Sequence, residues 1–493
     1  MSQQARFLNL SSFFWQPCQP TPVKAPQWMV WNQDLAQQLK LPEELQYQHR
    51  ESQALDILAG NQELPICTAF AATYAGHQFG YFNPQLGDGR AITLGEVKDS
   101  HGDYWELQLK GAGKTPYSRS GDGRSPIGPV IREYLLSEYM HKVGVPTTRA
   151  LAAVATGDWV YREDPEPGAI LTRMAQSHLR VGSFQYAAAH GGAEKTQELV
   201  EFVIQHYFPQ LQHAPFPALA LLDEVVNKQA QLIAHWMQIG FIHGVMNTDN
   251  MSILGDTIDY GPCAFMDDFK ADQFYSFIDK NGRYRYSRQP AIAQWNLSRF
   301  AESLLTIHIP QRESQEQAVD ELKSVIQQFK PKYEQAYYSG MLKKLGMPEV
   351  ETIATQDVQL IDNYLSLLEA DQLDYTRSFL ALEALLEEGE TENLFPANES
   401  WEAWLKEWKE RLKNLHIREE QAVATMQATN PSVIPRNHLI AQAIEEVESS
   451  GSLKLFNQLQ EVFATPYNRT LVNDSFAQPP QRGQEIENTF CGT

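Results

Sequence analysis

The pattern of apolar residues changes from strand-like to helix-like about a quarter of the way along the chain, and this change strongly constrains the fold. Before it, two short β-like runs, 91–97 and 104–109, each lead into a turn that contains Gly or Lys. After it, apolar residues recur at three- and four-residue steps through 128–143, behind two prolines. A longer amphipathic helix, 222–237, stops at a glycine and leads into a polar loop. We therefore expect an α+β fold with a small antiparallel sheet and a large helical part.

The charge balance argues against several classes of partner. The chain has 40 Lys and Arg residues against 61 Asp and Glu residues, which gives a formal net charge of −21. Such a chain repels nucleic-acid phosphates and anionic membrane surfaces. No window approaches the ~18 apolar residues of a membrane-spanning helix, and the N-terminus resembles neither a signal peptide nor a transit peptide. We expect a cytoplasmic protein with no nucleic-acid or membrane partner.

Polar residues gather in two short segments after the long helix. The first reads His243-Gly244-Val245-Met246-Asn247-Thr248-Asp249-Asn250, and Asp259-Tyr260-Gly261 follows it. The spacing from the His to the Asn resembles that of the protein-kinase catalytic loop, and Asp259 takes the place of the kinase Asp that holds the metal. Asn250 and Asp259 are therefore candidate ligands for Mg²⁺, a hard cation that prefers oxygen donors.

The carboxylate that a kinase uses as proton acceptor is missing from this loop. Val245 stands in its position, so Asp249, beside the metal ligand, is the nearby carboxylate available for that role. The alternative is an ordinary surface turn after a helix, because Asn and Asp favour turns. The segments that precede the loop favour the metal site.

Lys110 and Glu133 lie where a kinase has an ion pair. Lys110 directly follows the second β-like run, and Glu133 lies on the predicted helix 128–143, where it could pair with the lysine. A lysine at the end of a strand is commonly only solvated. The order of the segments makes this one informative, because a Gly-x-Gly turn precedes it and the helix, the loop and Asp259 follow.

Candidate phosphate contacts lie on two glycine turns and two arginines. Gly87 and Gly89 form a turn into a strand, and Arg90 follows them. The backbone N–H groups of this turn could approach phosphate. An ordinary hairpin turn is the alternative, because it favours the same residues. A second turn contains Asp122 and Gly123. Arginine suits bidentate phosphate contacts, which makes Arg173 and Arg180 candidates, with surface salt bridges as the alternative.

Taken together, these motifs closely resemble the selenoprotein O / YdiU family of kinase-like protein adenylyltransferases, over nearly the whole chain. The resemblance also rests on Tyr74-Ala75-Gly76-His77-Gln78-Phe79-Gly80, Lys110-Gly111-Ala112-Gly113 and Asn430-Pro431-Ser432-Val433-Ile434-Pro435-Arg436-Asn437. It implies a two-lobed, protein-kinase-like fold with a small antiparallel N-lobe sheet, a large helical C-lobe and a C-terminal helical extension. It further implies that ATP binds in reverse relative to a kinase, so that AMP is transferred to Ser, Thr or Tyr side chains of proteins and pyrophosphate leaves.

The resemblance also assigns roles to individual residues. It gives Asp249 as proton acceptor, Asn250 and Asp259 as ligands of Mg²⁺ or Mn²⁺, and Glu133 as the structural partner of Lys110. It places nucleotide contacts at Gly87, Gly89, Arg90, Lys110, Asp122, Gly123, Arg173, Arg180 and Asp259. The implied partners are ATP and protein substrates, and we expect a monomer.

Five regions are expected along the 493 residues, a length that favours a two-lobed body with helical additions. They are an N-terminal extension packed on the body (1–80), an N-lobe-like nucleotide-binding region (81–180), a C-lobe with the catalytic loop (181–295), a helical C-terminal region (296–465) and a flexible tail (466–493).

The cysteines suggest a redox element. The four lie far apart without a C-x-x-C pair, which argues against a zinc site or a disulfide framework and favours a reducing compartment. Cys263 lies two residues after Gly261, and Cys491 lies near the end of the tail, where several members of the family carry selenocysteine. A disulfide between them would pin the tail across the site entrance, and two unpaired thiols are the alternative.

Two other functions remain open at this stage. One is a protein kinase that uses Asp249 as a substitute base, and the other is a non-catalytic scaffold that binds ATP. The sequence leaves undecided which proteins are modified, which hydroxyl residue accepts the group, and whether UTP can replace ATP.

Overall fold

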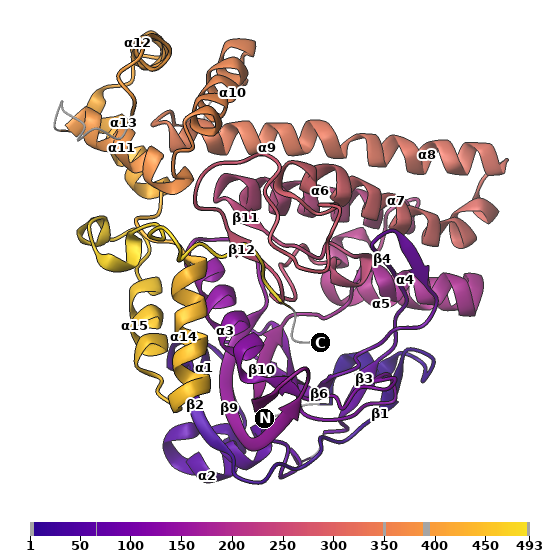
Figure 1. Ribbon diagram of the computed structural model, residues 1–493. Helices are drawn as coiled ribbons and strands as arrows, with labels where there is room; N and C mark the ends of the chain where they lie inside the picture. The colour runs from indigo at the N-terminus through magenta and orange to yellow at the C-terminus, as the bar shows by residue number, and fades with distance from the viewer. Residues whose placement is uncertain (1–3, 66, 349–351, 388–394, 491–493) are drawn as a thin grey trace.

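The computed structural model describes residues 4–65, 67–348, 352–387 and 395–490 (Figure 1). It is an α+β structure in which an antiparallel sheet lies at one end and a larger helical body at the other (Figure 1). Among the described helices, none is both long and apolar enough to cross a membrane.

The secondary-structure elements have the following bounds. The strands are β1 (Trp15–Pro17), β2 (Gln27–Trp31), β3 (Phe70–Ala72), β4 (Gly76–Gln78), β5 (Tyr81–Asn83), β6 (Ala91–Lys98), β7 (Tyr104–Lys110), β8 (Ser125–Pro126), β9 (Arg149–Tyr161), β10 (Pro165–Ala175), β11 (Phe241–Ile242) and β12 (Ala264–Phe265). The helices are α1 (Gln33–Gln38), α2 (Tyr47–Leu58), α3 (Ile127–Lys142), α4 (Val181–Tyr186), α5 (Gly192–Tyr207), α6 (Pro217–Gln238), α7 (Gln289–His308), α8 (Gln315–Gln327), α9 (Phe329–Lys344), α10 (Thr355–Ala370), α11 (Tyr375–Glu387), α12 (Glu399–Asn414), α13 (Glu419–Thr429), α14 (Asn437–Ser450) and α15 (Lys454–Phe463).

The main sheet is larger than the small sheet that the sequence predicts. Its strands run in the order β1-β3-β6-β7-β10-β9-β2, every neighbouring pair is antiparallel, and β8 pairs with β10. The predicted runs 91–97 and 104–109 are β6 and β7. The first 80 residues, expected as an extension, supply β1, β2 and β3. The long pair β9 and β10 escaped prediction because β9 begins with the alanine-rich run Arg149-Ala-Leu-Ala-Ala, and alanine has little strand preference.

Side chains of β7 alternate between the two faces of the sheet. Leu107 and Leu109 point into the smaller apolar core, which α1 and α2 help to cover. Glu106, Gln108 and Lys110 take the intervening positions and are buried on the opposite face. The strand therefore presents a row of polar groups toward the interior of the molecule.

Helix α3 lies against this polar face and packs on β9 and β10. Its bounds agree with the predicted helix 128–143 to within one residue. The C-terminal helices α14 and α15 return along the chain to pack against α3 (Figure 1). Twelve of its sixteen residues are buried, so neighbours on several sides hold its position.

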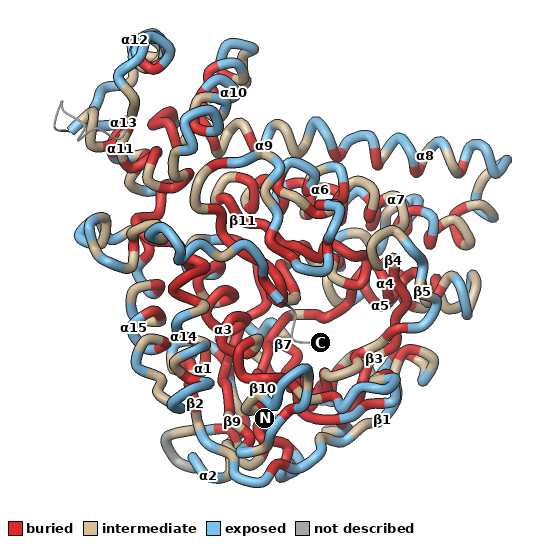
Figure 2. The backbone as a smooth tube through the Cα atoms, in the orientation of Figure 1, coloured by how far each residue is buried: buried red, intermediate tan, exposed pale blue. Residues whose placement is uncertain are grey.

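The helical body is built around α6, which contacts α7, α8 and α9. Helix α6 contains the predicted segment 222–237 and is followed by the short strand β11 and the polar loop. Many residues of α6 are buried, and so are those of the short strands β11 and β12 (Figure 2). Trp401, Trp404 and Trp408 of α12 are buried, as the sequence predicts.

Candidate active site

Four charged side chains meet on the inner face of the sheet. Lys110 Nζ lies 2.5 Å from Glu133 Oε2 on α3 and 3.1 Å from Asp259 Oδ1. Arg173 Nη1 lies 3.2 Å from the other oxygen of Glu133. The register pairs Arg173 of β10 with Gln108 of β7, whose Oε1 accepts hydrogen bonds from Arg173 Nε and Nη2. The predicted pair of Lys110 and Glu133 is therefore present in the structure.

Asp259 is held as an anion by this cluster. Burial alone would raise the pKa of Asp259, but Lys110, Arg90 and Arg173 together keep it well below its usual range. Its φ of 69° lies in the left-handed region that side chains other than glycine rarely adopt, so the surrounding chain imposes this conformation. The carboxylate is 26% exposed, which leaves it accessible from the interior of the site.

Asp249 lies on a 3₁₀ turn, Thr248–Asn250, and is buried. Its Oδ2 accepts a hydrogen bond of 2.9 Å from Gln78 Nε2, whereas its Oδ1 is buried without a partner among the described residues. Burial raises the pKa of Asp249 to about 6. Because buried carboxylate oxygens normally have partners, the open oxygen is a candidate contact for a bound group.

The donor set suits a cation that also binds phosphate. In the described part of the chain, no three His, Cys, Asp or Glu side chains converge to hold a metal by themselves. Asn250 donates its Nδ2 to the carbonyl oxygen of Val245 at 3.0 Å, so its own side-chain oxygen is the end left for a ligand. One amide oxygen and the Asp259 carboxylate are too few donors for a protein-only site, but Mg²⁺ commonly takes one or two protein oxygens and completes its shell with phosphates and water.

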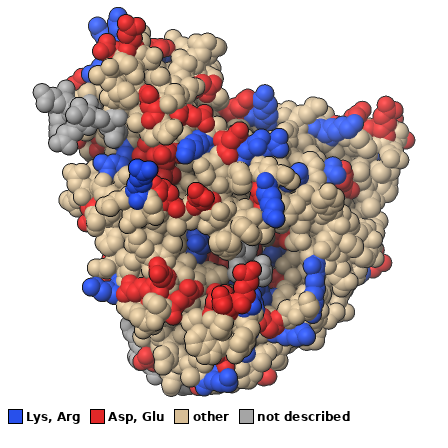
Figure 3. Space-filling view, viewed as in Figure 1, with Lys and Arg blue, Asp and Glu red and all other residues tan. Residues whose placement is uncertain are grey.

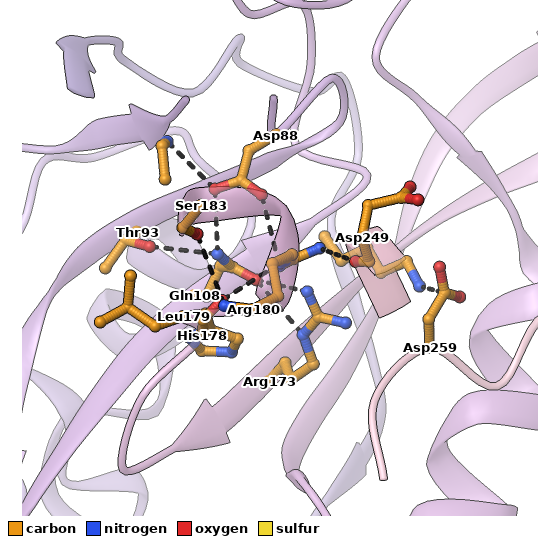
Figure 4. A network of polar contacts seen from close by, with 12 residues as sticks. Asp88, Thr93, Gln108, Arg173, His178, Leu179, Arg180, Ser183, Asp249 and Asp259 are labelled. Carbon is orange, nitrogen blue, oxygen red and sulfur yellow. Dashed lines mark hydrogen bonds and ion pairs between the residues drawn. The ribbon is translucent and has the colours of Figure 1, made fainter. Parts of the chain in front are cut away.

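Arg180 connects the sheet to the polar loop. Its Nη1 donates to the backbone oxygen of Asp249 at 3.1 Å, and its Nη2 lies 3.7 Å from Asp88 Oδ1 (Figure 4). Its guanidinium carbon lies 4.4 Å from the centre of the Tyr74 ring. Arg180 is only 6% exposed, so these partners fix its position. Figure 4 shows Arg173 beside it, between Gln108 and Asp259.

The first glycine turn is shaped by Tyr117. Gly87 has a φ of 136°, and a side chain there would collide with the Tyr117 ring. A Cβ on Gly89 would lie 3.1 Å from the backbone oxygen of Tyr117. Asp88, between the two glycines, lies 3.7 Å from Arg180 and accepts a hydrogen bond of 3.5 Å from Gln108, the residue that holds Arg173 of the charged cluster. Arg90 acts electrostatically on Asp259.

Within the described part of the chain, the second glycine turn lies apart from the charged cluster and bonds to other segments. Asp122 is paired with Arg162 at 3.0 Å, and its side chain is 43% exposed. Gly123 has a φ of 69° and lies so close to the backbone of Gly113 that no side chain would fit. The described contacts thus leave Asp122 and Gly123 apart from the charged cluster, and these contacts join Asn250 only to its own loop.

A family model described as "Protein adenylyltransferase SelO" matches residues 1–464. The chain belongs to the SelO family. Proteins named "Protein nucleotidyltransferase YdiU" from Rhizobium meliloti (strain 1021) and Bacillus cereus (strain AH187) are each 44% identical to it, over 491 and 488 residues. The alignments cover 99% of this chain and 98% and 97% of those proteins. A protein of the same name from Maridesulfovibrio salexigens is 42% identical over 490 residues. The resemblance seen in the motifs is confirmed.

Several side chains of this SelO-family site are not predictable from local motifs. Gln78 contacts Asp249 across 171 positions of sequence. Gln108 and Asp88 hold the two arginines, and Gln108 is fully buried. A signal that could have revealed Gln108 is the alternation of Glu106, Gln108 and Lys110 along β7. A buried strand with polar side chains on one face needs polar partners for them.

Basic and acidic side chains are interspersed over the face of the molecule seen in Figure 3, and the surface is hollowed between the sheet and the helical body. The chain end approaches this region, since Thr489 Oγ1 donates to the carbonyl oxygen of Pro262 at 2.5 Å. The predicted Cys263 is buried beside Pro262, and Cys491 lies outside the described residues.

Proposed function

We propose that this SelO-family enzyme transfers AMP from ATP to hydroxyl side chains of proteins and releases pyrophosphate. The observation that carries the proposal is the match to an adenylyltransferase family over nearly the whole chain, on a structure that gathers Lys110, Glu133, Arg173 and Asp259 on the inner face of the sheet. The related proteins are named nucleotidyltransferases, which supports the transfer of a nucleotide rather than of a single phosphate.

We propose further that the fold is protein-kinase-like. A sheet lysine paired with a helix glutamate, followed by a loop with Asn250 and then by Asp259, is the order of parts that phosphoryl-transfer enzymes of the kinase class use. In this proposal ATP lies reversed, so that its α-phosphate faces the acceptor. The five regions bounded at residues 80, 180, 295 and 465 remain our proposed division of the chain.

Each charged group has a role in positioning the triphosphate. Asn250 and Asp259 would hold Mg²⁺ or Mn²⁺, which neutralises phosphate charge when it is bound. Lys110 is held by Glu133 and would contact a phosphate oxygen directly. Arg173 lies on the same face and would stabilise negative charge that develops as pyrophosphate departs. We assign further nucleotide contacts to Gly87, Gly89, Arg90, Asp122, Gly123 and Arg180.

Asp249 is proposed as the proton acceptor. The acceptor oxygen forms a bond to the α-phosphorus, and the bond from that phosphorus to the oxygen bridging to the β-phosphate breaks. The hydroxyl proton passes to Asp249, and pyrophosphate carries away the electron pair of the broken bond. Its unpartnered Oδ1 supports this role, and so does a pKa of about 6, which leaves the carboxylate mostly ionised at neutral pH while making it more basic than an ordinary Asp.

The transferred group can be identified with labelled ATP. The protein is incubated with Mg²⁺, an acceptor protein and ATP that carries the label on either the α- or the γ-phosphate. We expect protein-bound label from the α-position alone. Label from the γ-position alone would refute AMP transfer in favour of a kinase, and ATP binding without transfer from either position would identify a scaffold.

We also retain the pairing of Cys263 with Cys491 as a proposal. The contact between Thr489 and Pro262 supports it, because these residues lie two positions from Cys491 and one position from Cys263. We propose the cytoplasm as the compartment and a monomer as the working form of the enzyme.

A further inference from the structure

Large apolar side chains are exposed on two segments that flank the loop 244–249. They are Tyr81 of the β4–β5 hairpin, here called the hairpin patch, and Phe274, Phe277 and Ile278, here called the loop patch. The neighbouring Phe82 pairs with His77 and therefore projects from the other face of the hairpin. Tyr81 is 82% exposed, and Phe277 and Ile278 are about half exposed, at 51% and 50%. Exposed apolar side chains that cluster near a site commonly mark a surface that binds another molecule.

The hairpin patch is attached directly to the loop that carries Asp249. The backbone N–H of His77 donates to Thr248 Oγ1 at 2.6 Å, and Gln78 Nε2 donates to Asp249 Oδ2 at 2.9 Å. In the β4–β5 hairpin, Gln78 pairs with Tyr81. Paired residues of antiparallel strands project from the same face, so the Tyr81 side chain lies on the face from which Gln78 reaches Asp249.

The loop patch lies against the other end of the same loop. A Cβ placed on Gly244 would lie 3.3 Å from the Cβ of Ser276, so segment 274–278 passes close to the loop backbone. Farther along, the Tyr284 hydroxyl donates to Asn247 Oδ1 at 2.6 Å. The two patches therefore belong to segments that hold the loop 244–249 from different sides.

The tail of the chain indicates what kind of segment the loop patch can bind. Thr489 forms a parallel bridge with Ser276, in which its N–H donates to the Tyr275 oxygen at 2.7 Å and its oxygen accepts from the Phe277 N–H at 3.1 Å. The next side chain, Phe490, lies on Phe277 with ring centres 5.1 Å apart. The patch thus contacts an extended chain that carries an aromatic side chain.

We propose that acceptor proteins bind through an extended segment whose apolar side chains flank the modified hydroxyl residue and pack on the hairpin patch and the loop patch. This inference rests on the proposed function. It follows from the position of the hairpin patch beside Asp249, the group that would accept the hydroxyl proton, and of the loop patch beside Gly244 of the same loop. Burial of apolar area is favourable without charge complementarity, so the enzyme can select acceptors despite its net charge of −21.

The test uses the full-length enzyme and synthetic peptides with a single Ser, Thr or Tyr. One set carries Leu and Phe on both sides of the hydroxyl residue, and a matched set carries Gln and Ala there. AMP transfer is measured with α-labelled ATP over a range of peptide concentrations. We expect kcat/KM to be about tenfold higher for the apolar set, the scale of discrimination that apolar contacts provide.

Variants locate the preference on the enzyme. The variants Tyr81→Ser and Phe277→Ser/Ile278→Ser should each raise KM for apolar peptides and leave it nearly unchanged for polar ones. ATP affinity by calorimetry should stay at the wild-type value in both. Trp159→Ser/Tyr161→Ser is the matched control, because Trp159 and Tyr161 are also exposed aromatics, at 60% and 72%, but lie on strand β9.

The outcomes separate this inference from the proposed function. If no peptide or protein receives label from wild-type enzyme, the proposed function fails. If both peptide sets are labelled equally well, or if the control variant loses the preference as much as the patch variants do, AMP transfer stands and the docking inference is overturned. A concentration-dependent dimer in light scattering that both patch variants dissociate would also overturn it, in favour of self-association.

Discussion

Glu133 is the residue whose loss should separate the role of the charged cluster most clearly from general stability. It is 3% exposed and lies between Lys110 and Arg173, at 2.5 and 3.2 Å. In this cluster the positive charges of Lys110 and Arg173 are balanced by the negative charges of Glu133 and Asp259. Glu133→Gln keeps the size of the side chain but leaves one net positive charge in a buried environment.

Both stability and transfer should fall. Removal of one partner from a buried ion pair typically costs about 3–5 kcal/mol, because the remaining charge stays desolvated. Lys110 would still contact Asp259 at 3.1 Å, but it would lose the ion pair with Glu133 that fixes it to α3. A misplaced group that stabilises charge in the transition state costs about 10²–10³ in rate. We therefore expect the rate of AMP transfer to fall by that factor. The free energy of unfolding, measured in urea, should fall by roughly 3 kcal/mol or more.

Glu138→Gln on the same helix is the matched control. Glu138 forms a comparable pair with Arg149 at 2.7 Å and accepts the Ala150 N–H at 2.8 Å. Its loss should lower the free energy of unfolding but leave the rate per folded molecule near the wild-type value. Both variants are compared by urea unfolding and by transfer assays well below their melting temperatures. Equal transfer rates for Glu133→Gln and Glu138→Gln would refute a specific role for the Glu133 pair.

Four further predictions concern single sites. Asp259→Ala should abolish transfer, with a loss of at least about 10²-fold, and near-normal turnover in the presence of excess Mg²⁺ would contradict the metal assignment. Asp249→Ala should slow transfer while calorimetry shows nearly unchanged ATP affinity; a collapse of affinity would make it a structural or metal residue instead. Lys344→Met should raise the free energy of unfolding at about pH 6, because burial lowers the pKa of the folded lysine to about 7. The gain should shrink as pH rises from about 7 toward about 10, where the lysine of the unfolded chain also becomes neutral; an equal gain in urea unfolding at both pH values would contradict it. Oxidised protein should gain transfer activity on thiol reduction, and Cys491→Ser should remove that response; identical activities in all four samples would leave the pair with Cys263 without a role.

Much of the site could be predicted because its chemistry follows short segments in a fixed order. The β7 lysine and the helix glutamate lie in elements that periodicity finds, and the loop before Asn250 has a characteristic spacing. The kinase comparison therefore placed Lys110 beside Glu133 without any coordinates, and the structure joins them at 2.5 Å.

The remaining parts depend on contacts between distant segments. The long strand β9 opens with alanines, whose weak preference gives no strand signal, and only its partners β2 and β10 make it a strand. Gln78 looks like a residue of an ordinary surface hairpin until the fold brings Asp249 to it. A local pattern holds no information about such a contact, because burial and hydrogen bonding are decided by the tertiary arrangement.

The position of β1 and β2 at opposite edges of the sheet has a consequence for the order in which the chain can fold during synthesis. These strands leave the ribosome first, and the segment between them crosses the sheet, where Thr21 N–H donates to the Ala112 oxygen at 2.9 Å and Ala25 N–H donates to the Thr156 oxygen at 3.1 Å. The residue that pairs with Trp31 on β9, Ala152, emerges about 120 residues later, which takes on the order of 10 s at ordinary rates of protein synthesis. During that interval β2 lacks its partner, and the sheet can be completed only after β9 and β10 have been made.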